Sequence, residues 1–144
     1  MATQTVNRAR FEGRTVMVLG GNSGIGRASA LAFADEGAFV IITGRNPETL
    51  AEVQSLLGSR GKTFQSDISD IEGTRQLMQQ LKADYGRLDV LFVNAGTGSF
   101  RMVEEVDEAF YDEIFAINLK GPYFAVKHAI PLLGEGSSVV LTSS

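Results

Sequence analysis

The sequence predicts an α/β fold with a parallel sheet, and two observations support this prediction. Short apolar runs alternate along the chain with longer stretches in which apolar side chains recur at helical spacing, which is the pattern of repeated strand-helix-strand units. The runs are almost continuously hydrophobic, as expected of parallel strands that helices cover on both faces. The predicted strands are residues 15–19, 39–43, 62–66, 90–94 and 138–143.

Two of the predicted helices carry start and stop signals. Asn46 and Pro47 predict a helix start, because an Asn side chain accepts from free backbone amides and Pro has no amide to leave unpaired. Residues 69–72, Ser-Asp-Ile-Glu, have the spacing of a capping box for the next helix. Gly86 is the expected end of that helix.

A further helical stretch, residues 107–133, is long and interrupted. Gly121 and Pro122 lie inside it, and they predict a bend or a break into two helices. No repeat, low-complexity tract or linker divides the chain. We therefore expect a single domain over residues 1–144, with a loose N-terminal tail at residues 1–10.

Composition and charge argue against several classes of function. The net charge is −4 and Lys and Arg form no runs, which disfavours a partner such as DNA, RNA or an anionic membrane. No apolar stretch approaches the roughly 18 residues of a membrane span, and the polar N-terminus lacks a signal sequence, so we expect a cytoplasmic protein. The chain has no Cys and a single histidine, His128, and no metal site is expected.

The strongest chemical signal lies where the first predicted strand meets the first helix. Residues 16–27 run from an apolar strand into a glycine-rich turn, VMVLGGNSGIGR. Glycine permits a positive φ and lets the backbone approach a pyrophosphate, while the N-terminus of the following helix offers free amides and the positive end of its dipole. The turn therefore predicts a dinucleotide-binding site, although glycines in a tight turn can also serve packing alone.

The glycine spacing is G-x-x-x-G-x-G, at Gly20, Gly24 and Gly26, and it resembles that of the short-chain dehydrogenase/reductase family. Leu19 departs from the family, which commonly has Thr there. The resemblance implies a Rossmann-type, doubly wound, three-layer α/β/α fold with strand order 3-2-1-4-5. It also implies that the whole loop, Ile25 included, contacts the cofactor.

Three further matches follow in the family's order. They are Asp67 with Ile68, the motif Asn94-Ala95-Gly96, and Asn118. The resemblance implies that Asp67 hydrogen-bonds the adenine amino group, with Ile68 beside the ring. It also implies that the Asn-Ala-Gly motif supports the sheet and lies along the cofactor, and that Asn118 holds a water in a proton relay. Taken singly, each residue has a structural explanation, such as a turn or a strand end.

Cofactor choice is expected at the end of the second strand, where a carboxylate would hold the ribose hydroxyls of NAD. Gly44 occupies that place, and the next residue, Arg45, is positioned to pair with a phosphate. The sequence therefore favours NADP over NAD, with Asn22 and Ser23 as further candidate donors to the phosphate. Arg45 stacked on the adenine or left in solvent is the alternative interpretation.

Residues 138–144 resemble the family's fifth strand, and the resemblance places Ser144 on the catalytic serine. The family's Tyr-x-x-x-Lys motif lies further on, and the match covers a little over half of a typical member, so we expect the family's C-terminal strands to be lacking. Tyr123 and Lys127 have the motif's spacing. They precede the fifth strand, and we interpret them as a coincidence on a helix.

Two functions follow from the resemblance. The first is an oxidoreductase that transfers hydride between NADP(H) and a small-molecule carbonyl or alcohol substrate, with Asn118 and Ser144 as the catalytic residues present. The alternative is a truncated, catalytically incompetent dinucleotide-binding module. In either case we expect a homo-oligomer formed through the helices in residues 107–133.

Overall fold

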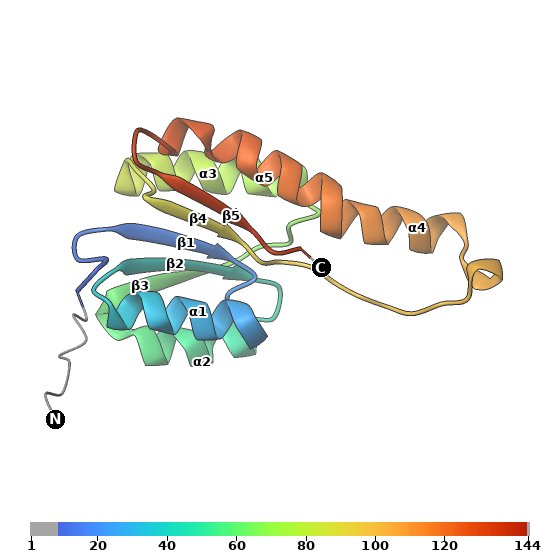
Figure 1. The fold of residues 1–144 in the computed structure, drawn as a ribbon, viewed down its shortest axis with the longest axis horizontal. Coiled ribbons are helices and arrows are strands. Elements are labelled where there is room, and N and C mark those ends of the chain that lie inside the picture. Colours follow the sequence, from blue (N-terminus) through green and yellow to red (C-terminus); the bar gives the residue numbers. More distant parts are fainter. Residues whose placement is uncertain (1–8, 144) are drawn as a thin grey trace, which may run out of the picture.

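The protein is built on one sheet of five parallel strands in the order β3-β2-β1-β4-β5 (Figure 1). The structure, a computed structural model, describes residues 9–143. The strands are β1 (Thr15–Leu19), β2 (Phe39–Gly44), β3 (Gly61–Gln65), β4 (Val90–Val93) and β5 (Ser138–Leu141). Their number, direction and order confirm the predicted fold class.

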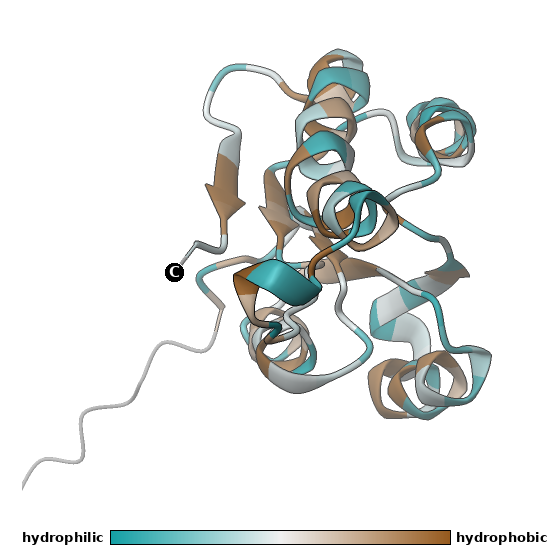
Figure 2. Cartoon of the chain, turned by 90° about the vertical axis from the view of Figure 1, so that its right-hand side faces the viewer, coloured by the Kyte–Doolittle hydropathy of each residue, from teal (hydrophilic) through white to brown (hydrophobic). Residues whose placement is uncertain are grey.

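Helices cover both faces of this sheet, in the three-layer arrangement that the sequence predicts (Figures 1 and 2). The helices are α1 (Gly24–Asp35), α2 (Pro47–Leu57), α3 (Ile71–Tyr85), α4 (Glu108–Phe115) and α5 (Gly121–Ala129), with short turns η1 (Gly58–Arg60), η2 (Val103–Glu105), η3 (Ala116–Lys120) and η4 (Ile130–Leu132). Helices α1 and α2 lie on one face, and α3 and α5 lie on the other. Among the described residues, no helix is long and apolar enough to cross a membrane.

The core consists of two apolar clusters, one on each face of the sheet. Because side chains alternate along a strand, Val18 and Ile42 point towards α1 and α2, while Met17, Ile41 and Leu91 point towards α3 and α5. These five side chains are fully buried. The central strands therefore have the two-sided cover that their hydrophobic sequences predict.

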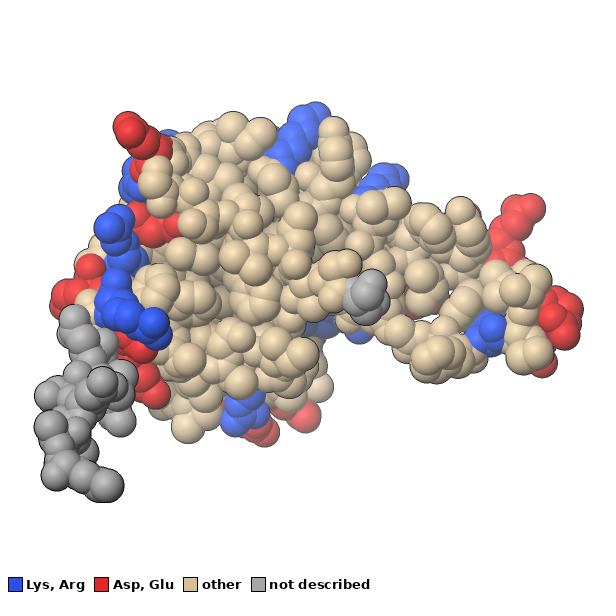
Figure 3. Space-filling view, viewed as in Figure 1, with Lys and Arg blue, Asp and Glu red and all other residues tan. Residues whose placement is uncertain are grey.

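Strand β5 differs from that prediction, because all four of its residues are exposed. Val140 is 48% exposed and Leu141 is 57% exposed. Figure 2 shows β5 at the outer edge of the sheet, where within the described chain it pairs with β4 alone. The space-filling view in Figure 3 is taken from the same direction as Figure 1. It shows no cluster of charged side chains over the middle of the molecule, where β5 lies in Figure 1.

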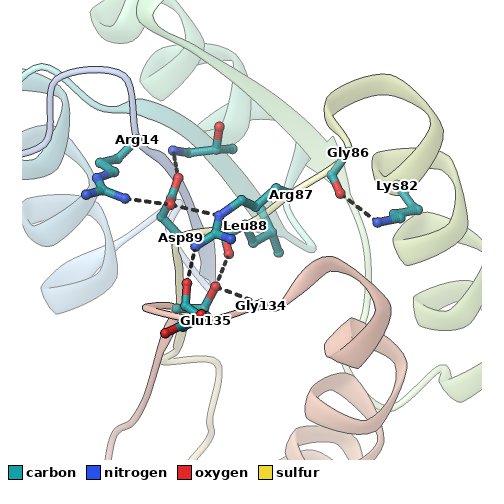
Figure 4. A network of polar contacts seen from close by, with 10 residues as sticks. Arg14, Lys82, Gly86, Arg87, Leu88, Asp89, Gly134 and Glu135 are labelled. Atoms are coloured by element: carbon teal, nitrogen blue, oxygen red, sulfur yellow. Dashed lines mark hydrogen bonds and ion pairs between the residues drawn. The ribbon is translucent and has the colours of Figure 1, made fainter.

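The N-terminal end of the sheet is closed by polar side chains that centre on Asp89 (Figure 4). Its carboxylate accepts from the Thr15 amide at 2.9 Å, from Arg14 at 3.1 Å and from Arg87 at 3.1 Å. Arg87 also donates to the carbonyl of Glu135 at 2.7 Å. These bonds join the segments that precede β1, β4 and β5.

A second set of bonds at the same end involves Ser137. Its hydroxyl donates to the carbonyl of Leu88 at 2.7 Å and accepts from the amide of Gly134 at 3.0 Å. The Leu88 amide in turn donates to the carbonyl of Leu132 at 2.9 Å. Of the expected loose tail, residues 1–8 lie outside the described residues, and Arg10 forms an ion pair with Glu36.

The helix starts follow the predicted signals, with one shift. Asn46 caps α2 by accepting from the amides of residues 48 and 49, and Pro47 is its first residue. Helix α3 is capped by Asp70, which accepts from the Gly73 amide at 2.9 Å. The predicted capping box begins one residue earlier, at Ser69, whose hydroxyl instead donates to Asp67.

The long helical stretch is interrupted, but it is not broken. Helices α4 and α5 continue into each other through η3, a wide π-turn over residues 116–120, and the backbone stays helical on both sides of it. The wide turn ends just before Gly121 and Pro122. Because Pro has no amide to donate, a change in hydrogen-bond pattern is expected there.

Candidate functional site

A large cleft, with a volume of about 1760 Å³, opens at the C-terminal ends of the strands. Ligands of open α/β sheets bind at this edge, where the strand order reverses between β1 and β4. The predicted site residues that line it are Gly20, Asn22, Ser23, Gly24, Ile25, Arg45, Asp67, Ile68, Asn94, Ala95, Gly96 and Asn118. Gly26 is buried beneath the loop, and Ser144 lies outside the described residues.

The glycine loop is packed so closely at Gly20 and Gly26 that neither position can hold a side chain. A Cβ atom on Gly20 would lie 2.7 Å from the Cα of Ala95, and a Cβ atom on Gly26 would lie 2.0 Å from the carbonyl oxygen of Gly20. Gly24 has a positive φ of +52°, as Gly20 has, but it differs in its surroundings, because a Cβ atom there would meet no other atom within 4 Å. Two glycines therefore let the loop pack on the sheet, while Gly24 leaves room above it.

The N-terminus of α1 is open where those of α2 and α3 are capped. Ser23 occupies the N-cap position of α1 but makes no side-chain capping hydrogen bond, and the first turn holds no acidic residue. At α2 and α3, the side chains of Asn46 and Asp70 accept from the first free amides. The amides and positive dipole end of α1 thus face the cleft and fit an anionic group such as a phosphate.

Asp67 lies in the cleft just after β3. Its Oδ1 accepts from the amide of Ser69 at 2.9 Å and from the Ser69 hydroxyl at 2.7 Å. Burial alone would raise the pKa of this carboxyl, but the Ser69 hydrogen bonds and the nearby charge of Arg45 outweigh burial and lower the pKa. Asp67 is therefore ionised at neutral pH and remains a hydrogen-bond acceptor.

Asn94, directly after β4, connects three strands at the base of the cleft. Its Nδ2 lies 3.4 Å from the carbonyl of Gly20 at the end of β1, and its Oδ1 accepts from the Thr142 hydroxyl at 2.8 Å. Thr142 follows β5 and also donates its amide to the carbonyl of Val93. The side chain of Asn94 thus fixes the positions of neighbouring loops, which agrees with a supporting role.

Asn118 extends from the π-turn and holds the loop after β4. Its Oδ1 accepts from the Thr97 amide at 2.8 Å, and its Nδ2 donates to the Thr97 carbonyl at 2.7 Å. A Cβ atom on Gly96 would lie 3.2 Å from the same Oδ1. The paired hydrogen bonds orient the Asn118 amide at the edge of the cleft.

The end of β2 carries no carboxylate, as the sequence indicates. Gly44 is buried and Arg45 is exposed at the rim of the cleft. The backbone carbonyl of Arg45 accepts from Gln65 at 3.0 Å, which ties this rim to the end of β3. An exposed guanidinium beside a glycine can accommodate an additional phosphate group.

Sequence reasoning missed several threonines that hold the site together. Thr142 binds Asn94, the backbone of Thr97 binds Asn118, and the Thr49 hydroxyl accepts from Asn22 at 2.8 Å. Thr142 could have been placed from the strand order, because β5 pairs with β4 and the residues after both strands lie level. Thr97 and Thr49 lie in segments without a comparable signal.

A five-stranded parallel sheet with a glycine loop and an open helix N-terminus at its switch point defines a Rossmann-type α/β protein. The chain matches the short chain dehydrogenase family over residues 14–144, and it belongs to that family. The family binds a nicotinamide dinucleotide. The described residues contain no cluster of His, Cys, Asp or Glu that would hold a metal ion.

Two curated relatives show how the length of this chain compares with theirs. It is 36% identical over 137 residues to Oxidoreductase asL5 of Sarocladium schorii, covering 94% of this chain and 55% of the relative. It is 34% identical over 139 residues to Versicolorin reductase stcU of Emericella nidulans, covering 94% of this chain and 53% of the relative. The chain thus spans about half the length of these relatives.

Solved structures agree with the fold in detail. A short chain dehydrogenase from Shigella flexneri, complexed with NADP, superposes with a TM-score of 0.89 at 31% identity, covering 95% of this chain and 61% of that chain. A short chain dehydrogenase from Escherichia coli CFT073, complexed with NADPH, gives a TM-score of 0.89 at 32% identity, with the same two coverages of 95% and 61%.

Proposed function

We propose that this chain forms the nucleotide-binding part of an NADP(H)-dependent oxidoreductase, and that the cleft holds the dinucleotide. The observation that carries the proposal is the uncapped N-terminus of α1 behind a glycine loop. Its amides have no side-chain partner from Ser23, and Gly24 leaves open space in front of them. A pyrophosphate supplies the negative charge and the acceptors that this arrangement lacks.

The remaining cofactor contacts follow from the pyrophosphate position. Asp67, kept ionised by Ser69, accepts from the adenine amino group, and Ile68 packs beside the ring. The backbone of 94–96 runs along the nicotinamide half, because β4 ends next to β1 at the same edge of the sheet. A dinucleotide that extends from β3 to β4 passes the loop after β1, where the pyrophosphate lies.

The preference for NADP rests on the end of β2. Gly44 offers no carboxylate to hold free ribose hydroxyls or to repel a phosphate, and the exposed Arg45 can form charge-assisted hydrogen bonds to a 2′-phosphate. Asn22 and Ser23 line the same cleft. Two structural relatives are complexed with NADP and NADPH, which supports the same preference.

The proposed reaction is hydride transfer to or from a small-molecule carbonyl or alcohol. The nicotinamide supplies or accepts the hydride when it is bound. Asn118, oriented by Thr97 at the edge of the cleft, is proposed to hold a water that passes on a proton. Ser144 is proposed to hydrogen-bond the substrate oxygen.

A titration of the 144-residue chain with NADPH and NADH tests the proposal, read by calorimetry or nicotinamide fluorescence. We expect saturable binding that Gly24→Asp abolishes, because a carboxylate would then stand against the pyrophosphate. Gly13→Asp is the matched control: Gly13 also has a positive φ and open space around it, but it lies outside the cleft. Equal NADPH affinity in the Gly24→Asp variant and the wild type would contradict the phosphate site.

The role of Arg45 is tested separately. Arg45→Ala should weaken NADPH binding by about 1 to 3 kcal/mol and leave NADH nearly unchanged, because only NADPH carries the 2′-phosphate. Equal losses for both nucleotides would remove Arg45 from the specificity argument. Arg27→Ala is a suitable control, since Arg27 pairs with Glu52 on α2.

We further propose that the helices in residues 107–133 form a homo-oligomer interface. An exposed apolar stripe follows this helical stretch at spacings of four residues: Tyr111, Phe115, Leu119 and Tyr123. Light scattering tests this proposal. We expect Phe115→Lys to reduce self-association and Asp112→Lys, on the same helix, to leave it unchanged.

A further inference from the structure

Gly44 and Asn22 occupy adjoining space at the rim of the cleft. A Cβ atom on Gly44 would lie 2.3 Å from both Cγ and Oδ1 of Asn22 and 2.8 Å from its Nδ2. All three distances are shorter than any contact that a real Cβ makes, so a side chain at position 44 requires the Asn22 amide to move. The absence of a side chain at the end of β2 is therefore coupled to the side chain at position 22.

The Asn22 amide is held where it is. Its Nδ2 donates to the Thr49 hydroxyl at 2.8 Å, and that hydroxyl donates in turn to the carbonyl of Asn46 at 3.1 Å. Asn46 is the N-cap of α2, so the chain of hydrogen bonds ends on a fixed part of the fold. Rotation of the Asn22 amide away from Gly44 would break the bond to Thr49.

The backbone of the loop is also fixed at this point. The amides of Gly20 and Gly21 both donate to the carbonyl of Thr43 at 3.0 Å, directly before Gly44. A Cβ atom on Gly21 would lie 2.7 Å from Ile42, so the loop and β2 are already in close contact. A shift of the whole loop away from β2 would break the two hydrogen bonds to Thr43.

We propose that Asn22, positioned by Thr49, determines cofactor specificity by excluding every side chain from position 44. A carboxylate that would hold the ribose hydroxyls of NAD cannot be placed at the end of β2 while the Asn22 amide occupies that volume. Selection of the 2′-phosphate thus depends on the pair Asn22 and Gly44 together, in addition to the charge of Arg45. This inference rests on the proposed function, in which the cleft binds a dinucleotide.

The steric part is tested by thermal unfolding, which needs no nucleotide. Gly44→Ala should lower the unfolding midpoint by roughly 5 °C or more, while Asn22→Ala together with Gly44→Ala should recover most of that loss, since Ala at position 22 lacks all three clashing atoms. Gly98→Ala is the control for adding a methyl group, because Gly98 has open space around it. Strictly additive effects of the two substitutions would overturn the proposal.

The positioning role of Thr49 has its own readout. Thr49→Val removes the hydroxyl that holds Asn22 and should reduce the penalty of Gly44→Ala, whereas Thr49→Ser keeps the hydroxyl and should keep the penalty. A penalty that is the same in both Thr49 backgrounds would show that Asn22 is not held by Thr49. The midpoint of each single variant supplies the reference for its double variant.

The specificity part is tested by titrating NADPH and NADH into the same chains. Gly44→Asp alone should give a chain of lowered midpoint that gains no NADH affinity. Asn22→Ala with Gly44→Asp should move the NADPH-to-NADH affinity ratio towards NADH by about tenfold or more, because the new carboxylate can accept from the ribose hydroxyls of NADH and repels the 2′-phosphate of NADPH. A stable Gly44→Asp chain that already prefers NADH would overturn the inference.

The two measurements separate the inference from the function on which it rests. If the wild-type chain binds neither nucleotide, the proposed function and the specificity role both fail, and the unfolding data still decide whether Asn22 excludes a side chain at position 44. If the wild type prefers NADPH but the double variant keeps that preference, the dinucleotide site stands and the role of Asn22 is refuted.

Discussion

The two ends of the parallel sheet are constructed differently. At the N-terminal end, charged and hydroxyl side chains join the segments around β1, β4 and β5, with the nearly buried carboxylate of Asp89 bound by an amide and two guanidinium groups (Figure 4). At the C-terminal end, the loop after β1 packs through glycines, and the N-terminus of α1 has no capping side chain. Both ends belong to the same strands, so the difference comes from the connecting segments alone.

This difference indicates a division of roles between the two ends. Hydrogen bonds that are satisfied within the chain stabilise the fold but leave nothing for a ligand. Amides that are left without a partner contribute nothing to stability, but they are available to an anion. Substitutions at the N-terminal end should therefore change stability, whereas those at the C-terminal end should change binding unless they disturb the glycine packing or remove a helix cap.

The largest effect on stability is expected where the C-terminal end of the sheet is packed most tightly. Gly26→Ala places a methyl group against the Gly20 carbonyl and the Asn94 amide, and backbone atoms cannot rotate away. We expect a loss of about 3 kcal/mol in the free energy of unfolding, measured by urea titration. The control Gly98→Ala should change the free energy of unfolding by less than about 0.5 kcal/mol, because Gly98 has open space around it. A Gly26→Ala variant of wild-type stability would mean that the loop is not packed as described.

Asp89→Ala should give the next largest loss. It leaves the Thr15 amide without its acceptor and removes one of the two acceptors of Arg87, and we expect a loss of about 2 kcal/mol in the free energy of unfolding. Glu135→Ala is a matched control in the same network, because Arg87 binds the carbonyl of Glu135, which the substitution retains. The control should change stability by less than about 0.5 kcal/mol. Similar losses in the two variants would argue against Asp89 as the centre of the network.

The same carboxylate predicts how stability depends on pH. Burial would raise the pKa of Asp89, but the bonds from the Thr15 amide, Arg87 and Arg14 outweigh burial and lower it. A lowered folded-state pKa means that the contribution is present above the unfolded value of about 4 and is lost as the pH falls through the folded value. The wild-type unfolding free energy should therefore fall more steeply below about pH 4 than that of Asp89→Asn. Parallel curves would contradict this.

The smallest effects distinguish the N-termini of α1 and α2, which both lie at the C-terminal end of the sheet. Asn46→Ala removes the cap of α2 and should cost about 1 kcal/mol of stability. Ser23→Ala removes a hydroxyl that caps nothing within the chain, so its effect on stability should remain within about 0.5 kcal/mol. Calorimetric unfolding of both variants gives the comparison. If Ser23→Ala costs as much as Asn46→Ala, the N-terminus of α1 is capped in solution.

The layers and the strand order could be predicted because they depend on patterns that are local in sequence. Apolar runs give the strands, and β1 has the predicted bounds. The remaining strand ends differ slightly because pairing decides them: β3 begins at Gly61, opposite Val40 of β2. The exposed faces of β5 could not be predicted from its apolar sequence, because the burial of a strand depends on what covers it.

For the site, the residue types and their spacing indicated the cleft but not its internal contacts. Glycine spacing and the Asn-Ala-Gly motif placed the predicted residues along one cleft. The bonds of Asn22 to Thr49 and of Asn94 to Thr142 join segments 27 and 48 residues apart. The strand order places Thr142 level with Asn94, whereas the bond of Asn22 to Thr49 depends on how α2 packs beside the glycine loop and requires the three-dimensional structure.

The π-turn at residues 116–120 has a consequence for the helices on either side of it. A turn of this kind contains about one residue more than an α-helical turn, and one residue corresponds to about 100° of rotation about the helix axis. Deleting a single residue within 116–120 would let α4 and α5 close into one regular helix. The side chains of α4, Tyr111 and Phe115 among them, would then point in a new direction relative to the sheet. The extra residue of the π-turn thus sets the direction in which the side chains of α4 point. The same turn places Asn118 against Thr97.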